Sequence, residues 1–225
     1  MQRQIILTAD GSHTVSIPEM KVTYHSVHGA IRESMHVFIE AGLRYWLERS
    51  KRPGQLSILE IGLGTGLNAL LTLQEAEKNK QLIHYTALEL YPLSKEEYSI
   101  LNYCDETGRP DLQNTFLTVH ECEWEKSIST GSYFTLYKTN QSLLDYTAIS
   151  NFQLIYFDAF APLAQPELWT VEIFRKLYNL LLTDGVLVTY CSKGDVRRAM
   201  QAAGFIIEKI PGPPGKREMI RAIKN

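Results

Sequence analysis

The chain has 225 residues, of which 44% are hydrophobic and 21% are charged, and its formal net charge is −2. This length suits one domain with a full hydrophobic core, and the slight negative charge argues against indiscriminate binding to nucleic acid. The three cysteines are far apart with no C-x-x-C pair, so the sequence indicates neither a disulfide framework nor a cysteine zinc site. No apolar run approaches the roughly 20 residues of a membrane span, and the polar N-terminus is unlike a signal peptide. We therefore expect a cytoplasmic protein with no membrane partner.

The first 33 residues are expected to form a small β-rich cap in front of the main domain, residues 34–225. Asp10-Gly11 is a hairpin-type turn signal between two β-prone segments. The β-prone segments lie at residues 4–8, 14–17 and 21–24.

The main domain is expected to begin with an amphipathic helix. From Ser34 to Leu47, apolar residues recur at every third or fourth position, which is the period of a helix with one buried face. The helix is expected to end before Pro53. Its apolar face would cover one side of a sheet.

A glycine-rich turn follows the first strongly apolar segment, which ends in an acid, Glu60. Its glycines alternate with other residues and lead into a helical segment that begins with Leu67 and Asn68. The glycines are Gly62, Gly64 and Gly66, with Thr65 before the last of them. Residues without a Cβ atom allow positive φ angles and let a flat ligand lie against the backbone, while the helix N-terminus offers N–H donors.

The spacing of this turn separates it from other glycine-rich ligand sites. The dinucleotide fingerprint is G-x-G-x-x-G, whereas this turn reads G-x-G-x-G after the acid. No Gly-Lys-Ser or Gly-Lys-Thr follows it, which excludes a P-loop. The turn resembles the first motif of the class I methyltransferases, which bind S-adenosylmethionine. A tight turn in some other α/β domain is the alternative.

Strands and helices alternate after the turn, which predicts right-handed parallel crossovers in an α/β fold. Helices are predicted over residues 67–79, from about Ser94, from Pro166 and from Ser192 to Ala203, and strands over residues 84–90, 116–120, 154–157 and 186–190. Two last strands, residues 205–210 and 217–223, are joined by a proline- and glycine-rich segment and are expected to pair antiparallel. That pair disfavours a purely parallel nucleotide-binding fold.

Two acids stand where predicted strands end. Glu89 lies 23 positions after Gly66, where a carboxylate can accept hydrogen bonds from two ribose hydroxyls of a ligand in the turn. Asp158 follows a buried strand and precedes Phe160 and Pro162. This order sets a carboxylate beside a rigid, partly apolar wall, which can hold an amine in line with a methyl sulfonium.

Four motifs together resemble the methyltransferase domain of the bacterial tRNA-modifying MnmC family. They lie at residues 60–68, 89–92, 158–162 together with 166–170, and 215–219, and the similarity extends from about Tyr24 to the C-terminus. The resemblance implies a Rossmann-like class I fold: a mostly parallel, seven-stranded sheet with an antiparallel C-terminal strand pair and a small β-rich N-terminal extension.

The same resemblance implies an activity. The expected reaction moves a methyl group from S-adenosyl-L-methionine to the amine of 5-aminomethyl-2-thiouridine at the tRNA wobble position, giving 5-methylaminomethyl-2-thiouridine. Because the chain ends at Asn225, it resembles the stand-alone, MnmD-like form without the FAD-dependent oxidase domain. No flavin is therefore expected. No metal is expected either, because no acid or cysteine completes a metal site near His25 and His28.

The resemblance also assigns residues to the cofactor. Those residues are Glu60, Gly62, Gly64, Thr65, Gly66, Asn68, Glu89, Asn140 and Asp158. Asn140 is expected near the adenine, where the family has an acid, and it can still accept a hydrogen bond through its carbonyl oxygen. Ala159 stands where the family commonly has glycine, which predicts a slightly tighter pocket.

Asp158 is the expected catalytic residue. Our hypothesis is that it orients the amine and accepts a proton directly or through water, while Phe160 and Pro162 exclude bulk solvent. Tyr24, Phe160 and Trp169 are aromatic candidates for stacking on the tRNA anticodon loop, with core packing favoured for Trp169. His25 is interpreted, with His28, as an ordinary surface residue.

Positive charge is concentrated near the C-terminus. From Val186 to Asn225 there are eight basic and three acidic residues, so a basic face is expected on an otherwise acidic body. The candidates for contacts with tRNA phosphates are Arg197, Arg198, Lys216 and Arg217. Several phosphate contacts would make tRNA affinity fall steeply with salt.

Three other functions agree with parts of the pattern. An aminopropyltransferase of the spermidine-synthase type shares the fold and an aspartate loop, but its polycationic substrate calls for more acids than Asp158 alone. A noncatalytic tRNA-binding protein of the same fold would not need Asp158 and the complete glycine turn. An NAD oxidoreductase is disfavoured by the spacing of the turn and by the terminal strand pair.

Overall fold

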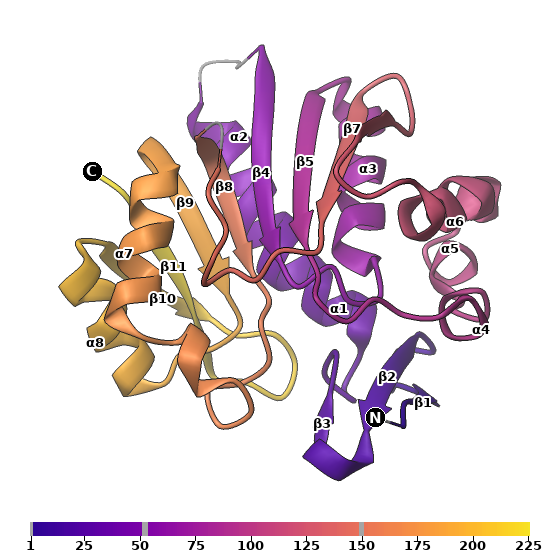
Figure 1. Cartoon of the computed structure of the whole chain (residues 1–225), viewed down its shortest axis with the longest axis horizontal. Coiled ribbons are helices and arrows are strands. Elements are labelled where there is room, and N and C mark those ends of the chain that lie inside the picture. Colours follow the sequence, from indigo (N-terminus) through magenta and orange to yellow (C-terminus); the bar gives the residue numbers. More distant parts are fainter. Residues whose placement is uncertain (1, 51–53, 149–150) are drawn as a thin grey trace.

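The computed structural model describes residues 2–50, 54–148 and 151–225, and its main feature is an eight-stranded sheet. The strand order is β10-β11-β9-β8-β4-β5-β7-β6, with helices on both faces (Figure 1). The strands are β4 (Gln55–Ile61), β5 (Leu82–Leu88), β6 (Ser127–Ser129), β7 (Phe134–Thr139), β8 (Phe152–Phe157), β9 (Leu181–Thr189), β10 (Ile206–Pro211) and β11 (Glu218–Ile223).

The pairing of these strands confirms the expected α/β arrangement. Strands β7, β5, β4, β8 and β9 run parallel to one another, whereas β11 is antiparallel to both β9 and β10. These seven strands are the predicted sheet with its antiparallel C-terminal pair. The short strand β6 adds an antiparallel edge beside β7.

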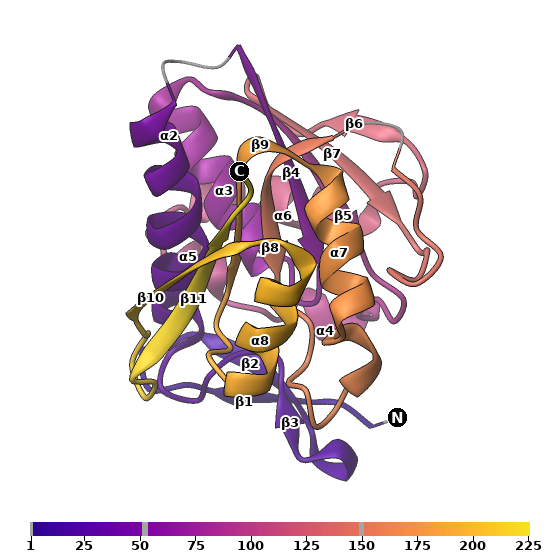
Figure 2. The ribbon, with the colours of Figure 1, turned by 90° about the vertical axis from the view of Figure 1, so that its left-hand side faces the viewer.

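Helices bury both faces of the parallel strands, so consecutive strand residues such as Ile58 and Leu59 are both fully buried. One face is covered by a continuous helix of three labelled parts, α1 (Ala30–Ser34), η2 (Met35–Arg44) and α2 (Tyr45–Arg49), and by α3 (Leu67–Asn79). The other is covered by α7 (Val171–Leu180) and α8 (Gly194–Ala203). Figure 2 shows the long helix and α8 on opposite sides of β9 and β11. The shorter helices are η1 (Pro18–Met20), α4 (Lys95–Tyr98), α5 (Tyr103–Glu106), η3 (Pro110–Leu112), α6 (Gln113–Glu121) and η4 (Pro166–Leu168).

The N-terminal residues form a separate three-stranded antiparallel sheet, as predicted. Its strands are β1 (Gln4–Leu7), β2 (His13–Ile17) and β3 (Val22–Thr23). The turn between β1 and β2 binds the start of the long helix: Thr8 Oγ1 and Asp10 Oδ2 accept the N–H groups of Ala30 and Arg32 at 3.3 and 3.0 Å. This distant cap explains why the helix begins at Ala30, ahead of the expected position and inside the expected cap.

The strand predicted over residues 116–120 is wrong, because these residues belong to helix α6. Phe116 and Val119 are fully buried, and their spacing of three places both on one face of a helix. Strand β7 takes the expected sheet position beside β5.

The helix predicted from Pro166 begins later than expected. Pro166 opens only the single turn η4, and α7 begins after Thr170, whose hydroxyl accepts the N–H of Ile173 at 3.3 Å. The predicted helices at residues 67–79 and up to Ala203 are confirmed. Pro53, where the first long helix was expected to have ended, lies outside the described residues.

Among the residues that the structure describes, no helix is both long and apolar enough to cross a membrane.

Candidate active site

A cavity opens at the edge of the large sheet where the parallel strands β4, β5 and β8 end. It is lined by residues 61–65 of the glycine turn, 88–91 after β5 and 158–160 after β8. Tyr24 and His25, which follow β3, close it from the side of the N-terminal sheet, which lies below this edge in Figure 1. Open α/β sheets bind their ligands at this edge.

The glycine turn has the backbone that its sequence predicts. The φ angles of Gly62, Gly64 and Gly66 are +89°, +53° and +74°, in the region that favours glycine. A Cβ atom at Gly62 would lie 3.1 Å from the backbone oxygen of Asp158, and one at Gly64 would lie 3.0 Å from the ring of Tyr24. The turn therefore lets the loop after β8 and the N-terminal segment approach closely.

Glu89 joins the glycine turn to the segment after β5. Its Oε2 accepts the N–H of Gly64 at 2.8 Å, and its Oε1 accepts the N–H of Tyr91 at 2.8 Å. Both oxygens keep a second lone pair, so the carboxylate can also accept hydrogen bonds from hydroxyl groups of a ligand in the cavity.

A single amide holds two acids beneath the turn. The Nδ2 group of Asn68 donates to Glu60 Oε1 and to Asp158 Oδ2, each at 2.9 Å. Burial raises the pKa of Glu60 well above its ordinary value. Burial also raises the pKa of Asp158, and the negative charge of Glu33 acts in the same direction. Asn68 opposes both shifts by donating to the charged forms.

Comparison with known proteins agrees with this geometry. A family model described as "S-adenosyl-L-methionine-dependent methyltransferase" matches residues 133–225. The MnmC protein of Azoarcus sp. (strain BH72), a "tRNA 5-methylaminomethyl-2-thiouridine biosynthesis bifunctional protein", is 31% identical over 88% of this chain and 32% of its own length. The chain is an S-adenosyl-L-methionine-dependent methyltransferase that resembles the methyltransferase part of the MnmC proteins.

Two further comparisons describe the extent of the similarity. The MnmC protein of Pseudomonas savastanoi pv. phaseolicola (strain 1448A / Race 6) is 30% identical over 88% of this chain and 31% of its own length. The methyltransferase thus spans about a third of the length of these relatives. The crystal structure of MNMC2 from Aquifex aeolicus superposes with a TM-score of 0.80 at 24% identity, covering 98% of this chain and 69% of that one, and it supports the fold.

The cavity of the methyltransferase fits its cofactor, S-adenosylmethionine. Residues 61–65 of the glycine turn line the cavity, and the lack of Cβ atoms on Gly62 and Gly64 lets the other cavity walls, at Asp158 and Tyr24, approach the turn closely. Glu89 would hold ribose hydroxyls, and Leu63 and Leu90 offer apolar surface. Within the described residues, the buried Thr65 hydroxyl has no hydrogen-bond partner. When bound, the cofactor supplies an electrophilic methyl group with a neutral leaving group.

Side chains that the sequence analysis did not assign to the site hold the loop after Asp158. Gln165 Oε1 accepts the N–H of Phe160 at 2.8 Å, and Trp169 Nε1 donates to the Phe160 oxygen at 2.8 Å. The Tyr190 hydroxyl donates to the Ala159 oxygen at 2.9 Å. Trp169 is only 6% exposed, which agrees with the favoured core role. The loop backbone is therefore fixed from two elements.

The N-terminal sheet contributes more to the cavity than its sequence suggests. The rings of Tyr24 and Phe160 meet edge to face with their centroids 5.1 Å apart. Arg3 donates to the backbone oxygens of Tyr91 at 2.5 Å and Pro92 at 3.1 Å, which ties the cap to the segment that carries Glu89. No local pattern around Arg3 could have predicted this contact.

The interpretation of His25 as a surface residue is wrong. Its side chain lines the cavity and is only 6% exposed, whereas His28 is exposed as expected. Burial lowers the pKa of His25 to about 4, so its ring is neutral at pH 7. Its Nδ1 lies 3.4 Å from the Thr14 hydroxyl on β2, a contact between strands that the sequence alone does not reveal.

The other predicted site residues differ in whether they lie at the cavity and in whether they are exposed or paired. Asn140 follows β7 but is exposed, and its neighbour Gln141 lines the cavity instead. Pro162 is half-buried beyond the cavity-lining residues 158–160. Among the basic candidates, Arg198 pairs with Asp195 and Lys216 pairs with Glu33, whereas Arg197 is half-buried and Arg217 is exposed.

The buried Glu60 leads to a prediction about stability. We expect the melting temperature of Glu60→Gln to exceed that of the wild type by a margin that grows as the pH rises above 4.5, the ordinary pKa of this side chain. Because the folded-state pKa is raised, the unfolded chain releases its proton first as pH rises, and wild-type stability falls until pH passes the folded-state pKa. Glutamine keeps the Asn68 contact without this loss.

Thermal unfolding of the cofactor-free protein, followed in steps from pH 4.5 upward, measures this difference. Glu48→Gln on the exposed end of α2 is the control, and its melting temperature should differ from that of the wild type by a constant amount. A margin for Glu60→Gln that stays constant with pH would contradict the prediction.

Proposed function

We propose that the chain methylates the amine of 5-aminomethyl-2-thiouridine at the wobble position of tRNA, using S-adenosylmethionine as donor and giving 5-methylaminomethyl-2-thiouridine. The names of the similar MnmC proteins point to this modification. The observation that carries the proposal is Asp158, a carboxylate at the cofactor cavity beside the Tyr24 and Phe160 rings. A carboxylate with an apolar wall suits an amine acceptor.

The amine must lose a proton before or during transfer. An alkylamine with a pKa of about 10.4 is mostly ammonium at pH 7, and exposing its lone pair costs roughly 4.6 kcal/mol. In the proposed step the carboxylate of Asp158 accepts this proton, directly or through water, as the new N–C bond forms and the S–C bond of the donor breaks. Burial raises the pKa of Asp158, which makes it a stronger base than an exposed aspartate.

The direct test is methyl transfer from labelled S-adenosylmethionine to tRNA from cells that lack the modification. Mass analysis of the nucleosides should show 5-methylaminomethyl-2-thiouridine. Cofactor binding without transfer to tRNA would contradict the proposal and would favour a polyamine acceptor or a noncatalytic role.

Two of the four basic candidates are suited to contact tRNA phosphates. Arg197 on α8 and Arg217 between β10 and β11 have no carboxylate within ion-pair distance among the described residues, in contrast to Arg198 and Lys216. Both arginines contribute positive charge that helps to lower the pKa of Glu218, so both lie near this residue. We therefore assign the phosphate contacts to this pair.

The double variant Arg197→Gln/Arg217→Gln is expected to weaken tRNA binding and to lower the slope of log affinity against log salt by about 2, one for each lost phosphate contact. Binding at several salt concentrations measures the slope. Arg49→Gln, an exposed arginine at the end of α2 and away from the cavity edge (Figure 1), is the control. An unchanged slope in the double variant would remove both residues from the tRNA interface.

A further inference from the structure

Lys216, which was expected to contact tRNA phosphates, instead contacts other side chains of the same protein. Its Nζ lies 2.5 Å from Glu33 Oε1 and 3.9 Å from the centroid of the Tyr190 ring. The Glu33 side chain is 8% exposed, and its other oxygen accepts the N–H of Ser26 at 2.7 Å. The ion pair thus joins the segment between β10 and β11 to the start of the long helix, 183 residues away in sequence.

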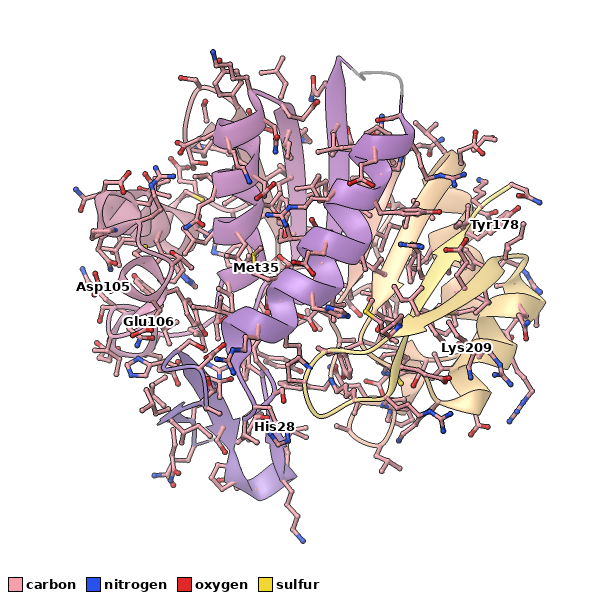
Figure 3. The ribbon with its side chains drawn as sticks, turned by 180° about the vertical axis from the view of Figure 1, so that it is seen from behind. His28, Met35, Asp105, Glu106, Tyr178 and Lys209 are labelled. Carbon is pink, nitrogen blue, oxygen red and sulfur yellow. The ribbon has the colours of Figure 1, made fainter. Side chains whose placement is uncertain are left out.

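The segment between β10 and β11 also lies close to residues 28 and 36. His36 Nε2 lies 2.8 Å from the Pro211 oxygen. Gly215 has a φ angle of +86°, and a Cβ atom there would lie only 2.3 Å from the ring of His28. Figure 3 shows His28 below the long helix, close to the loop that joins β10 and β11. Three contacts therefore hold this loop against residues 26–36.

The ion pair also connects to the loop that carries the proposed base. Tyr190, whose ring faces the Lys216 ammonium, donates its hydroxyl to the Ala159 oxygen, next to Asp158. The charges of Glu33 and Lys216 both act on Asp158, in opposite directions. Several titratable groups surround this cluster: Asp10 before β2, His25 after β3, Glu33 on α1, Glu60 on β4, Tyr85 on β5, Glu89 after β5, Tyr190, Cys191 and Lys193 after β9, and Lys216.

We propose that Glu33 and Lys216 form a positioning pair for methyl transfer, which holds the β10–β11 connection against the N-terminal segment and, through Tyr190, fixes the loop of Asp158. Lys216 is then not a phosphate contact, in contrast to Arg217 beside it. The proposal rests on the proposed function, because it supposes that Asp158 takes a proton from an acceptor amine. Neither residue of the pair has to touch the substrate.

The test is a cycle of single and double variants. Lys216→Met removes a positive charge near Asp158, so the acidic limb of the pH dependence of kcat/KM should move to higher pH, and kcat should fall about tenfold or more, with an unchanged KM for tRNA. Glu33→Gln removes a negative charge, so the limb should move to lower pH. The double variant should lie between the two, and Lys216→Arg should retain most of the activity.

Lys209→Met is the matched control. Lys209 forms an ion pair with Glu218 on the same hairpin, at a partly exposed position (Figure 3). Its loss should leave the pH limb in place. A Lys216→Met variant with a higher KM for tRNA, a lower salt slope and an unmoved pH limb would overturn the proposal and restore Lys216 as a phosphate contact.

A readout without tRNA separates this proposal from the proposed function. Hydrogen exchange at the amides of residues 159–161 and 163–165 in the cofactor-bound protein should be faster in Lys216→Met than in the wild type or Lys209→Met. If wild-type protein fails to methylate tRNA, the proposed function fails, yet this difference in exchange would still support the positioning role. Equal exchange in all three proteins would overturn it.

Discussion

Asp158→Asn is expected to lower kcat for methyl transfer to tRNA about 100-fold or more, the usual contribution of a positioned general base. Asparagine has nearly the same shape and can still accept the hydrogen bond from Asn68 Nδ2, now 2.9 Å long, so the loop should keep its place. It cannot accept a proton at neutral pH. Loss of kcat with cofactor affinity changed by less than about threefold would therefore isolate proton transfer from binding.

Single-turnover methyl transfer and calorimetric binding of S-adenosylmethionine measure the two quantities. Asp105→Asn is the control, because Asp105 is an exposed aspartate on α5, at one edge of the molecule (Figure 3), and does not line the cavity. The pH dependence gives a second check: burial raises the pKa of Asp158, so wild-type activity should fall at a higher pH than an ordinary aspartate would give. Normal turnover in Asp158→Asn would remove Asp158 from the chemistry.

The parts of the site that could be predicted are those encoded by local sequence. The glycine turn could be predicted because few residues other than glycine tolerate positive φ angles. The structure confirms such angles at Gly62, Gly64 and Gly66. Glu89 and Asp158 follow apolar strands, and parallel strands place their carboxyl ends at one edge. The hydrophobic period and the alternation of strands and helices are therefore enough to predict that these residues lie at one edge of the sheet.

The parts that could not be predicted depend on contacts between distant segments. The long helix begins at Ala30 because Thr8 and Asp10 cap it from another element, and no nearby residue signals that start. Likewise, the sequence alone gives Lys216 as one of several cations in a basic segment, whereas in the structure it forms an ion pair with the distant Glu33. Charge counting along a sequence cannot distinguish a paired lysine from an unpaired one.

The strand predicted over residues 116–120 was wrong for a different reason. A short segment of five residues, three of them apolar, fits a strand and one turn and a half of helix equally well. The choice is made by burial, since α6 packs Phe116 against Tyr103 and His120, with ring centroids 5.9 and 5.1 Å apart. His120 in turn lies 3.2 Å from the Thr65 oxygen, so this helix supports the glycine turn from outside.

The second large effect is expected from Gly62→Ala, which should weaken binding of S-adenosylmethionine at least tenfold, or roughly 1.4 kcal/mol. Two penalties combine at this position. The φ angle of +89° disfavours any residue with a Cβ atom, and that atom would stand 3.1 Å from the Asp158 oxygen. Because the obstacle is backbone, the turn and the loop after β8 must move apart, and both line the cavity.

Gly108→Ala separates the two penalties. Gly108 also has a positive φ angle, +69°, but a Cβ atom there would meet nothing within 4 Å. Its variant should lose roughly 1–2 kcal/mol of folding stability from backbone strain and keep its cofactor affinity. Gly62→Ala should lose stability and affinity together. Equal cofactor affinity in the two variants, measured by calorimetry, would show that the close approach of the glycine turn to Asp158 does not shape the site.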